Sequence, residues 1–114
     1  MLRDTTDYVQ GLLTALNNQV NFLTLARRFE NAERAAAEAV TVLAPLELPE
    51  ELADAHLGHA RTLLALDRLP EFETARSAAL ELYRRLEDDS PGGYAQKIAE
   101  AQSLGLEPPQ PASR

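Results

Sequence analysis

Two histidines, His56 and His59, are the residues in this chain best suited to metal binding or acid–base chemistry. Three residues is close to one helical turn, so both imidazoles would lie on the same side of a helix. Two ligands do not make a zinc site, because catalytic zinc needs three protein ligands and structural zinc four. Nearby carboxylates are not spaced to complete the set. We therefore expect no metal and interpret both histidines as packing or solvated side chains, whose charging below about pH 6.5 would loosen the packing.

Nucleophilic catalysis has equally little support in the residues. It needs a hydroxyl or thiol held beside a base, but the chain has no cysteine, and Thr62 is the only hydroxyl near the histidines. Gly92 and Gly93 lack the lysine and the spacing of a phosphate-binding loop. We expect no enzymatic activity, no catalytic residues and no cofactor.

Three asparagines are the more informative polar residues. Asn17, Asn18 and Asn21 fall within five positions of a long apolar-periodic segment. Asparagine is a mediocre helix former, because its amide competes for backbone hydrogen bonds, so the group has a local cost. An amide side chain has two donors and one acceptor, and can therefore bracket the main chain of a bound peptide. An exposed polar helix face explains the asparagines equally well.

The composition limits the partners of the chain. It has 114 residues, 45% hydrophobic, 25% charged and 5% aromatic, which suits one helix-rich domain. The net charge of −7 opposes binding to nucleic acid or to anionic lipid. No apolar run approaches the roughly 20 residues that span a bilayer, and the first residues do not resemble a signal peptide. We expect no nucleic-acid or membrane partner, and a cytoplasmic location.

Apolar periodicity and proline positions predict an all-α fold of two antiparallel helical hairpins followed by a capping helix. Proline is tolerated in the first turn of a helix, which places helix starts at Pro49 and Pro70. The predicted helices cover residues 6–27, 30–43, 49–67, 70–88 and 94–104. The domain would extend over residues 1–105, with hairpins at 6–44 and 49–88 and the cap at 91–104, and residues 106–114 would form a flexible tail.

The two hairpins repeat each other with an offset of forty residues. Ala15 aligns with Ala55 and Ala39 with Ala79. A helical unit that recurs with a period of roughly 20 to 50 residues is typical of an α-solenoid. The second predicted helix has small residues at Ala32 and Ala39, with the aromatic Phe29 in the turn before it.

The stretch from Ala15 to Val40 resembles a tetratricopeptide repeat (TPR). The similarity is to the long type, with about 40 residues per unit, found in kinesin light chains and in bacterial regulatory arrays. It extends over residues 15–105, with Phe72 in place of a small residue in the second unit and the cap resembling half of a third unit. The resemblance implies a scaffold that binds proteins in a groove formed by the first helix of each hairpin.

The resemblance implies which residues would line the groove. They are those on the inner faces of the first and third helices. The predicted peptide-binding set is Thr14, Asn17, Asn18, Asn21, Asp54, Leu57 and Arg61, with Thr24 and Leu64 beside it. The partner would be a protein or peptide segment. Alternatively, the chain is an oligomerisation element or a fragment of a longer array, with the apolar end of the first helix as the contact. A third hypothesis is a bundle that senses a small molecule between its helices.

Overall fold

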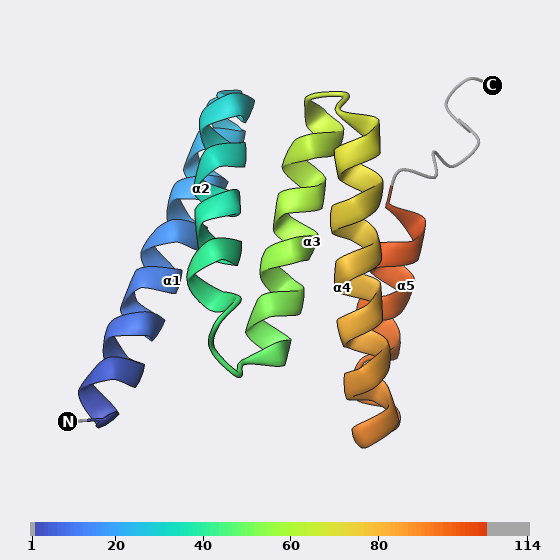
Figure 1. The fold of residues 1–114 in the computed structure, drawn as a ribbon. Helices are drawn as coiled ribbons and strands as arrows, with labels where there is room; N and C mark the ends of the chain where they lie inside the picture. Colours follow the sequence, from blue (N-terminus) through green and yellow to red (C-terminus); the bar gives the residue numbers. More distant parts are fainter. Residues whose placement is uncertain (1, 105–114) are drawn as a thin grey trace.

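Five α-helices make up the part of the chain that the computed structural model describes, residues 2–104, with side chains described from Tyr8 onwards. They are α1 (Leu2–Leu25), α2 (Phe29–Leu43), α3 (Pro49–Ala65), α4 (Leu69–Asp89) and α5 (Ala95–Ser103) (Figure 1). The all-α prediction is confirmed. Helix α1 begins four residues before the predicted position, because residues 2–5 contain no helix breaker although they precede the apolar stripe. The predicted tail at 106–114 lies outside the described residues.

Each helix packs mainly on its neighbours in the sequence, and short connections make consecutive helices antiparallel (Figure 1). In Figure 1, α2 lies in front of α1 and α4 in front of α5, with α3 between the two pairs. Within residues 2–104, none of the helices combines the length and the apolar character needed to cross a membrane.

The starts of α3 and α4 follow the local chemistry of helix ends. Proline stands in the first turn of both helices, where its missing N–H is not needed. Glu50 and Glu51 in α3 and Glu71 in α4 add negative charge near the positive end of the helix dipole.

The ends of α1 and α3 show the forty-residue repeat in backbone detail. Arg27 and Asp67 have left-handed φ angles of 62° and 60°. The next N–H, of Arg28 or Arg68, donates to the carbonyl five residues earlier, at 2.8 Å and 2.9 Å. The N–H of the left-handed residue itself donates three residues back, at 3.0 Å in both cases. Both ends are therefore Schellman motifs, which close a helix and set the direction of the next one.

Both hairpins combine buried alanines with larger side chains, which are leucines and Val9 in the first and include two aromatics in the second. Ala32, Ala36 and Ala39 of α2 are almost fully buried, which lets the axes of neighbouring helices approach closely. In the second hairpin, Phe72 and Tyr83 are buried among alanines of α3, α4 and α5. The second unit thus accommodates Phe72, where the repeat pattern has a small residue, by burying its ring in the core.

Helix α5 covers one end of the second hairpin. Its inner residue Ala101 is fully buried in a cluster with Leu57 and Tyr83. The turn before α5 depends on Glu87, whose carboxylate accepts hydrogen bonds from the N–H groups of Gly92 (2.6 Å) and Tyr94 (2.8 Å). Gly92 has a φ of 91°, a conformation that glycine adopts without a steric cost.

Candidate functional site

A hollow of about 140 Å³ lies between α1 and α3, on the side where the sequence predicts a groove. Asn21 and Thr24 line it from α1 and Arg61 from α3. Its other lining residues are mostly apolar or small: Val20, Phe29, Gly58, Thr62 and Ala65. The hollow thus combines an apolar floor with an amide, a hydroxyl and a guanidinium at its edge.

The remaining predicted residues of α1 are exposed but do not line this hollow. Thr14, Asn17 and Asn18 all face solvent. Successive helical residues are about 100° apart, so three residues make about 300°, which is equivalent to about 60° in the other direction. Asn18 therefore lies about 60° from Asn21 around the axis, away from α3. Asn17 lies on the same face as Asn21, one turn earlier, and Asn21 is the asparagine that lines the hollow with α3.

On α3, two predicted residues connect the groove side to α5. Arg61 pairs with Glu100, and Asp54 accepts a hydrogen bond from the hydroxyl of Tyr83 and lies 3.6 Å from Lys97 Nζ. Burial raises the pKa of Tyr83, and the hydrogen bond to Asp54 raises it further, so the hydroxyl remains a donor. Asp54 consequently supports the second hairpin as well as facing solvent.

Leu57 is a correction to the predicted set. Its side chain is only 2% exposed and packs with Ala53, Ala79 and Tyr83 in the core. One side of α3 faces the groove and the adjoining side packs against α4. Leu57 lies on the side that packs against α4. A bound peptide would not reach it.

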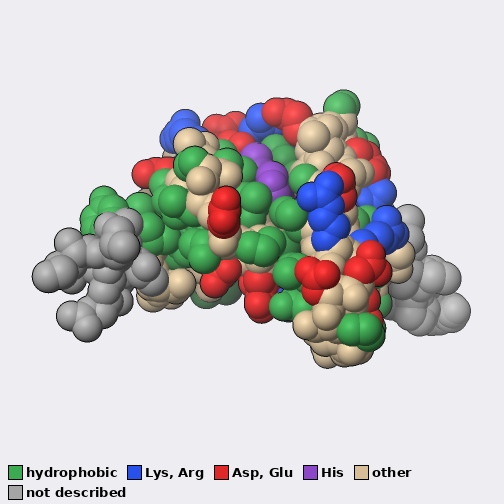
Figure 2. Space-filling view, turned by 60° about the horizontal axis from the view of Figure 1, so that its bottom comes forward, with side chains coloured by type: hydrophobic (Ala, Val, Ile, Leu, Met, Phe, Trp, Pro, Cys, Tyr) green, Lys and Arg blue, Asp and Glu red, His purple; other side chains and the backbone are tan. Residues whose placement is uncertain are grey.

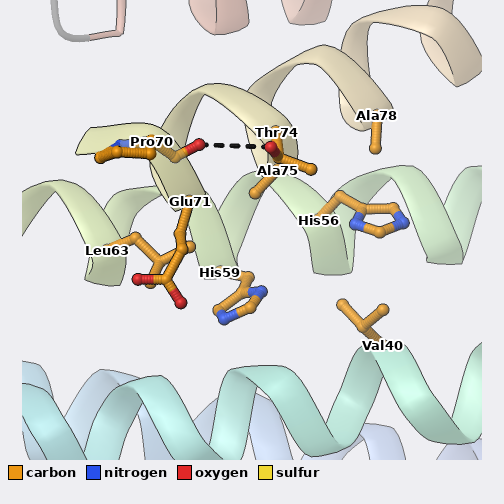
Figure 3. Close-up of a pocket in the computed structure, with 9 residues that line it drawn as sticks. All are labelled: Val40, His56, His59, Leu63, Pro70, Glu71, Thr74, Ala75 and Ala78. Atoms are coloured by element: carbon orange, nitrogen blue, oxygen red, sulfur yellow. Dashed lines mark hydrogen bonds between the residues drawn. The ribbon is translucent and has the colours of Figure 1, made fainter. Parts of the chain in front are cut away.

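A larger hollow of about 450 Å³ lies on the other side of α3, between α2 and α4. His56, His59 and Leu63 of α3 form its floor, Val40 borders it on α2, and Pro70, Glu71, Thr74, Ala75 and Ala78 border it on α4 (Figure 3). On the molecular surface, the two histidines lie side by side among mainly hydrophobic side chains (Figure 2). Pockets of about 300–1,000 Å³ accommodate small organic molecules, and this one offers apolar walls with imidazole groups for hydrogen bonding.

The two histidines have different surroundings. His59 Nε2 lies 2.7 Å from Glu33 Oε2 of α2, and Arg68 contacts Glu33 at 3.5 Å and Glu71 at 2.7 Å. These groups form a network that joins α2, α3 and the start of α4. For His56, burial lowers the pKa, and the neighbouring His59 lowers it further. His56 is therefore neutral at pH 7.

The sequence pattern indicates that His56 and His59 are packing or solvated side chains, and it does not predict this hollow. The lining comes from three helices, which no local pattern brings together. The acidic partner Glu33 is 26 positions from His59 in the sequence, so its contact depends on how α2 packs against α3. Among the side chains of residues 8–104, no group of three or more histidine, cysteine or carboxylate residues could hold a metal ion.

No protein-family model, curated protein or solved structure matches this chain.

Proposed function

We propose that this chain is a non-catalytic interaction module that binds an extended peptide segment of another protein in the groove between α1 and α3. The observation that supports this most directly is the hollow lined jointly by Asn21, Thr24 and Arg61. Two of these residues, Asn21 and Arg61, belong to the set predicted from the sequence, although 40 positions separate them.

The polar groups at the groove suit a peptide main chain. The amide of Asn21 and the hydroxyl of Thr24 each offer a donor and an acceptor, while Val20 and Phe29 provide apolar surface for a side chain of the peptide. Arg61 pairs with Glu100, and both side chains are about half exposed. Exposed ion pairs contribute little to stability, so Arg61 can exchange its partner for a carboxylate of the ligand at small cost.

The repeated Schellman motifs support a tetratricopeptide-like architecture for this module. Both hairpins begin with a helix that ends in the same hydrogen-bond pattern, forty residues apart. Helices α1 and α3 would then be equivalent first helices of two stacked units, and the groove would run across them.

Selection from a phage-displayed random peptide library, followed by ¹⁵N NMR titration with the selected peptides, tests the proposal. We expect amide shifts at Asn21, Thr24, Gly58 and Arg61. Replacing Asn21 and Arg61 together by alanine should weaken binding at least about tenfold, since two hydrogen bonds of about 1 kcal/mol each are lost.

The matched control is Gln19→Ala, because Gln19 is also an exposed amide on α1 but lies on the opposite side of the helix, about 200° from Asn21. It should bind like the parent chain. Selected peptides that shift only residues outside the groove, or that bind the double variant with unchanged affinity, would contradict the proposal. Circular dichroism and melting temperature establish that the variants are folded.

A further inference from the structure

An exposed stripe of α1 lies on the side opposite the helix's contact with the core. Its residues recur at alternating spacings of three and four: Tyr8, Gly11, Ala15, Asn18, Phe22 and Leu25. We call these six residues the α1 seam. All are exposed, and the three large ones strongly so, at 70% for Tyr8, 69% for Phe22 and 84% for Leu25. The spacing is that of the a and d positions at which one helix packs along another.

The internal repeat indicates that this stripe is a helix-packing face without its partner helix. Forty residues further along, the positions equivalent to Tyr8 and Ala15 are Leu48 and Ala55, which pack against the core of the first hairpin. The position equivalent to Phe22 is Thr62, which is 4% exposed. At these three positions the second unit covers side chains whose counterparts on α1 are exposed, whereas Ala65, the counterpart of Leu25, is exposed as well.

The charge distribution favours a second copy of this chain as the occupant. The chain has 29 charged residues and a net charge of −7, yet none of the 19 residues from Tyr8 to Ala26 is charged. Two acidic molecules can therefore approach along α1 without bringing like charges together in the contact.

The pattern of side-chain sizes also fits its own copy. Ala15 lies at the centre of the seam, with Tyr8 two turns before it and Phe22 two turns after it. When two α1 helices cross antiparallel at Ala15, Tyr8 meets Phe22 of the partner subunit twice, and Gly11 and Ala15 permit close approach. Antiparallel helix dipoles favour the same orientation.

Head-to-tail stacking has less support, because the opposite end of the described chain presents a different surface. Four of the six exposed side chains of α5 are polar, Gln96, Lys97, Gln102 and Ser103, and the other two are the small Ala95 and Ala99. An apolar stripe gains little by covering such a polar surface.

We infer that the chain forms a two-fold symmetric homodimer through an antiparallel contact of the α1 seam with the same seam of a second copy. The centre of the seam lies on a different side of α1 from the proposed peptide groove, because Asn21 and Thr24 are about 100° or more around the helix from Ala15 and Phe22. The seam residues Asn18 and Leu25 lie nearer the groove, within about 60° of Asn21. The contact is short, so the affinity belongs to the micromolar range typical of small interfaces.

Sedimentation velocity and light scattering of the full chain from about 5 to 500 µM test the dimer. We expect a concentration-dependent change from monomer to dimer. Phe22→Glu should raise the dissociation constant at least tenfold, since the like charge enters a desolvated contact. Leu69→Glu is the matched control, because Leu69 is an exposed large apolar residue on α4, at 47% exposure, and should leave association unchanged.

Single cysteine variants then test the geometry, since the chain has no cysteine of its own. Ala15→Cys should form a disulfide-linked dimer on mild oxidation, whereas Ser77→Cys on the exposed side of α4 should not. Leu25→Cys should also remain unlinked, because an antiparallel pair keeps the two Leu25 positions apart. A monomer at the highest concentration, a dimer unaffected by Phe22→Glu, or efficient linking through Leu25→Cys would overturn the inference. Peptide binding to Phe22→Glu separates failure of the dimer from failure of the groove.

Discussion

At the scale of single residues, the contrast between His56 and His59 shows how packing distinguishes two identical side chains. His59 has a carboxylate partner 2.7 Å away on α2, whereas burial and the charge of His59 disfavour the charged form of His56. Both line the 450 Å³ hollow between α2 and α4. The hollow is therefore a place where protonation and packing are coupled.

We predict that His56 makes the stability of the fold decrease at mildly acidic pH. Its pKa is lowered on folding, so the unfolded chain takes up the proton first as the pH falls below about 6.5. As the pH falls further, the free energy of unfolding should decrease, until the pH passes the lowered pKa of His56 in the folded state. His56→Gln keeps a polar side chain of similar size and removes this titration.

Urea unfolding of the parent chain and of His56→Gln between pH 8 and pH 5 measures the difference. The two curves should run parallel above pH 7 and diverge below about pH 6.5, with the parent chain losing more stability. Because the carboxylates titrate in both proteins, only the divergence reports on His56. Parallel curves over the whole range would contradict the lowered pKa.

At the scale of helices, the left-handed residues Arg27 and Asp67 give a matched pair of capping sites. Both occupy the C′ position of a Schellman motif, where glycine is the usual residue because a Cβ atom is strained at positive φ. Asparagine and aspartate tolerate this conformation better than other residues with a Cβ atom. The cost should therefore be greater at Arg27.

We predict that Arg27→Gly stabilises the fold by about 0.5 to 1 kcal/mol and that Asp67→Gly stabilises it by less. At Arg27, the free energy gained by relieving backbone strain exceeds the entropic cost of ordering a glycine on folding. At Asp67, these two contributions nearly cancel. Chemical denaturation of the two variants measures both changes. A destabilising effect of Arg27→Gly would contradict a strained left-handed conformation at Arg27.

At the scale of the whole molecule, helix α5 completes the core of the second hairpin. Ala101 is fully buried against Leu57 and Tyr83, whereas Ala99, half a turn away, is exposed. The two alanines have the same helix propensity, so substitution of each isolates the contribution of burial.

We predict that Ala101→Asp lowers the free energy of unfolding by about 3 kcal/mol, because it places an uncompensated charge in the core or forces α5 to undock. Ala99→Asp should change it by less than about 1 kcal/mol. Urea titration followed by circular dichroism compares the two variants. Equal effects would mean that α5 is not docked on Leu57 and Tyr83.

Signals within the sequence are sufficient to predict the five helices and their order. Alanine and leucine periodicity, prolines in first turns and the forty-residue offset are local or repeating signals, so they can be read without knowing any distant contact. Ala32 and Ala39, which the sequence pattern singles out, are both buried in α2. The prediction that Asn21 and Arg61 share one groove comes instead from the resemblance to tetratricopeptide repeats.

Which side chains meet across helices depends on how the helices pack, and the sequence pattern does not contain this information. Helical periodicity assigns a side chain to a face but does not say whether a neighbouring helix covers that face. For this reason the helical pattern predicts Leu57 in the groove, although residues of α4 and α5 bury it. The same pattern predicts neither the histidine hollow nor the contact of Glu33 on α2 with His59 on α3. The same reasoning applies to the α1 seam: its spacing is a property of the sequence, but its exposure depends on the absence of a packed helix on that side in the described part of the chain.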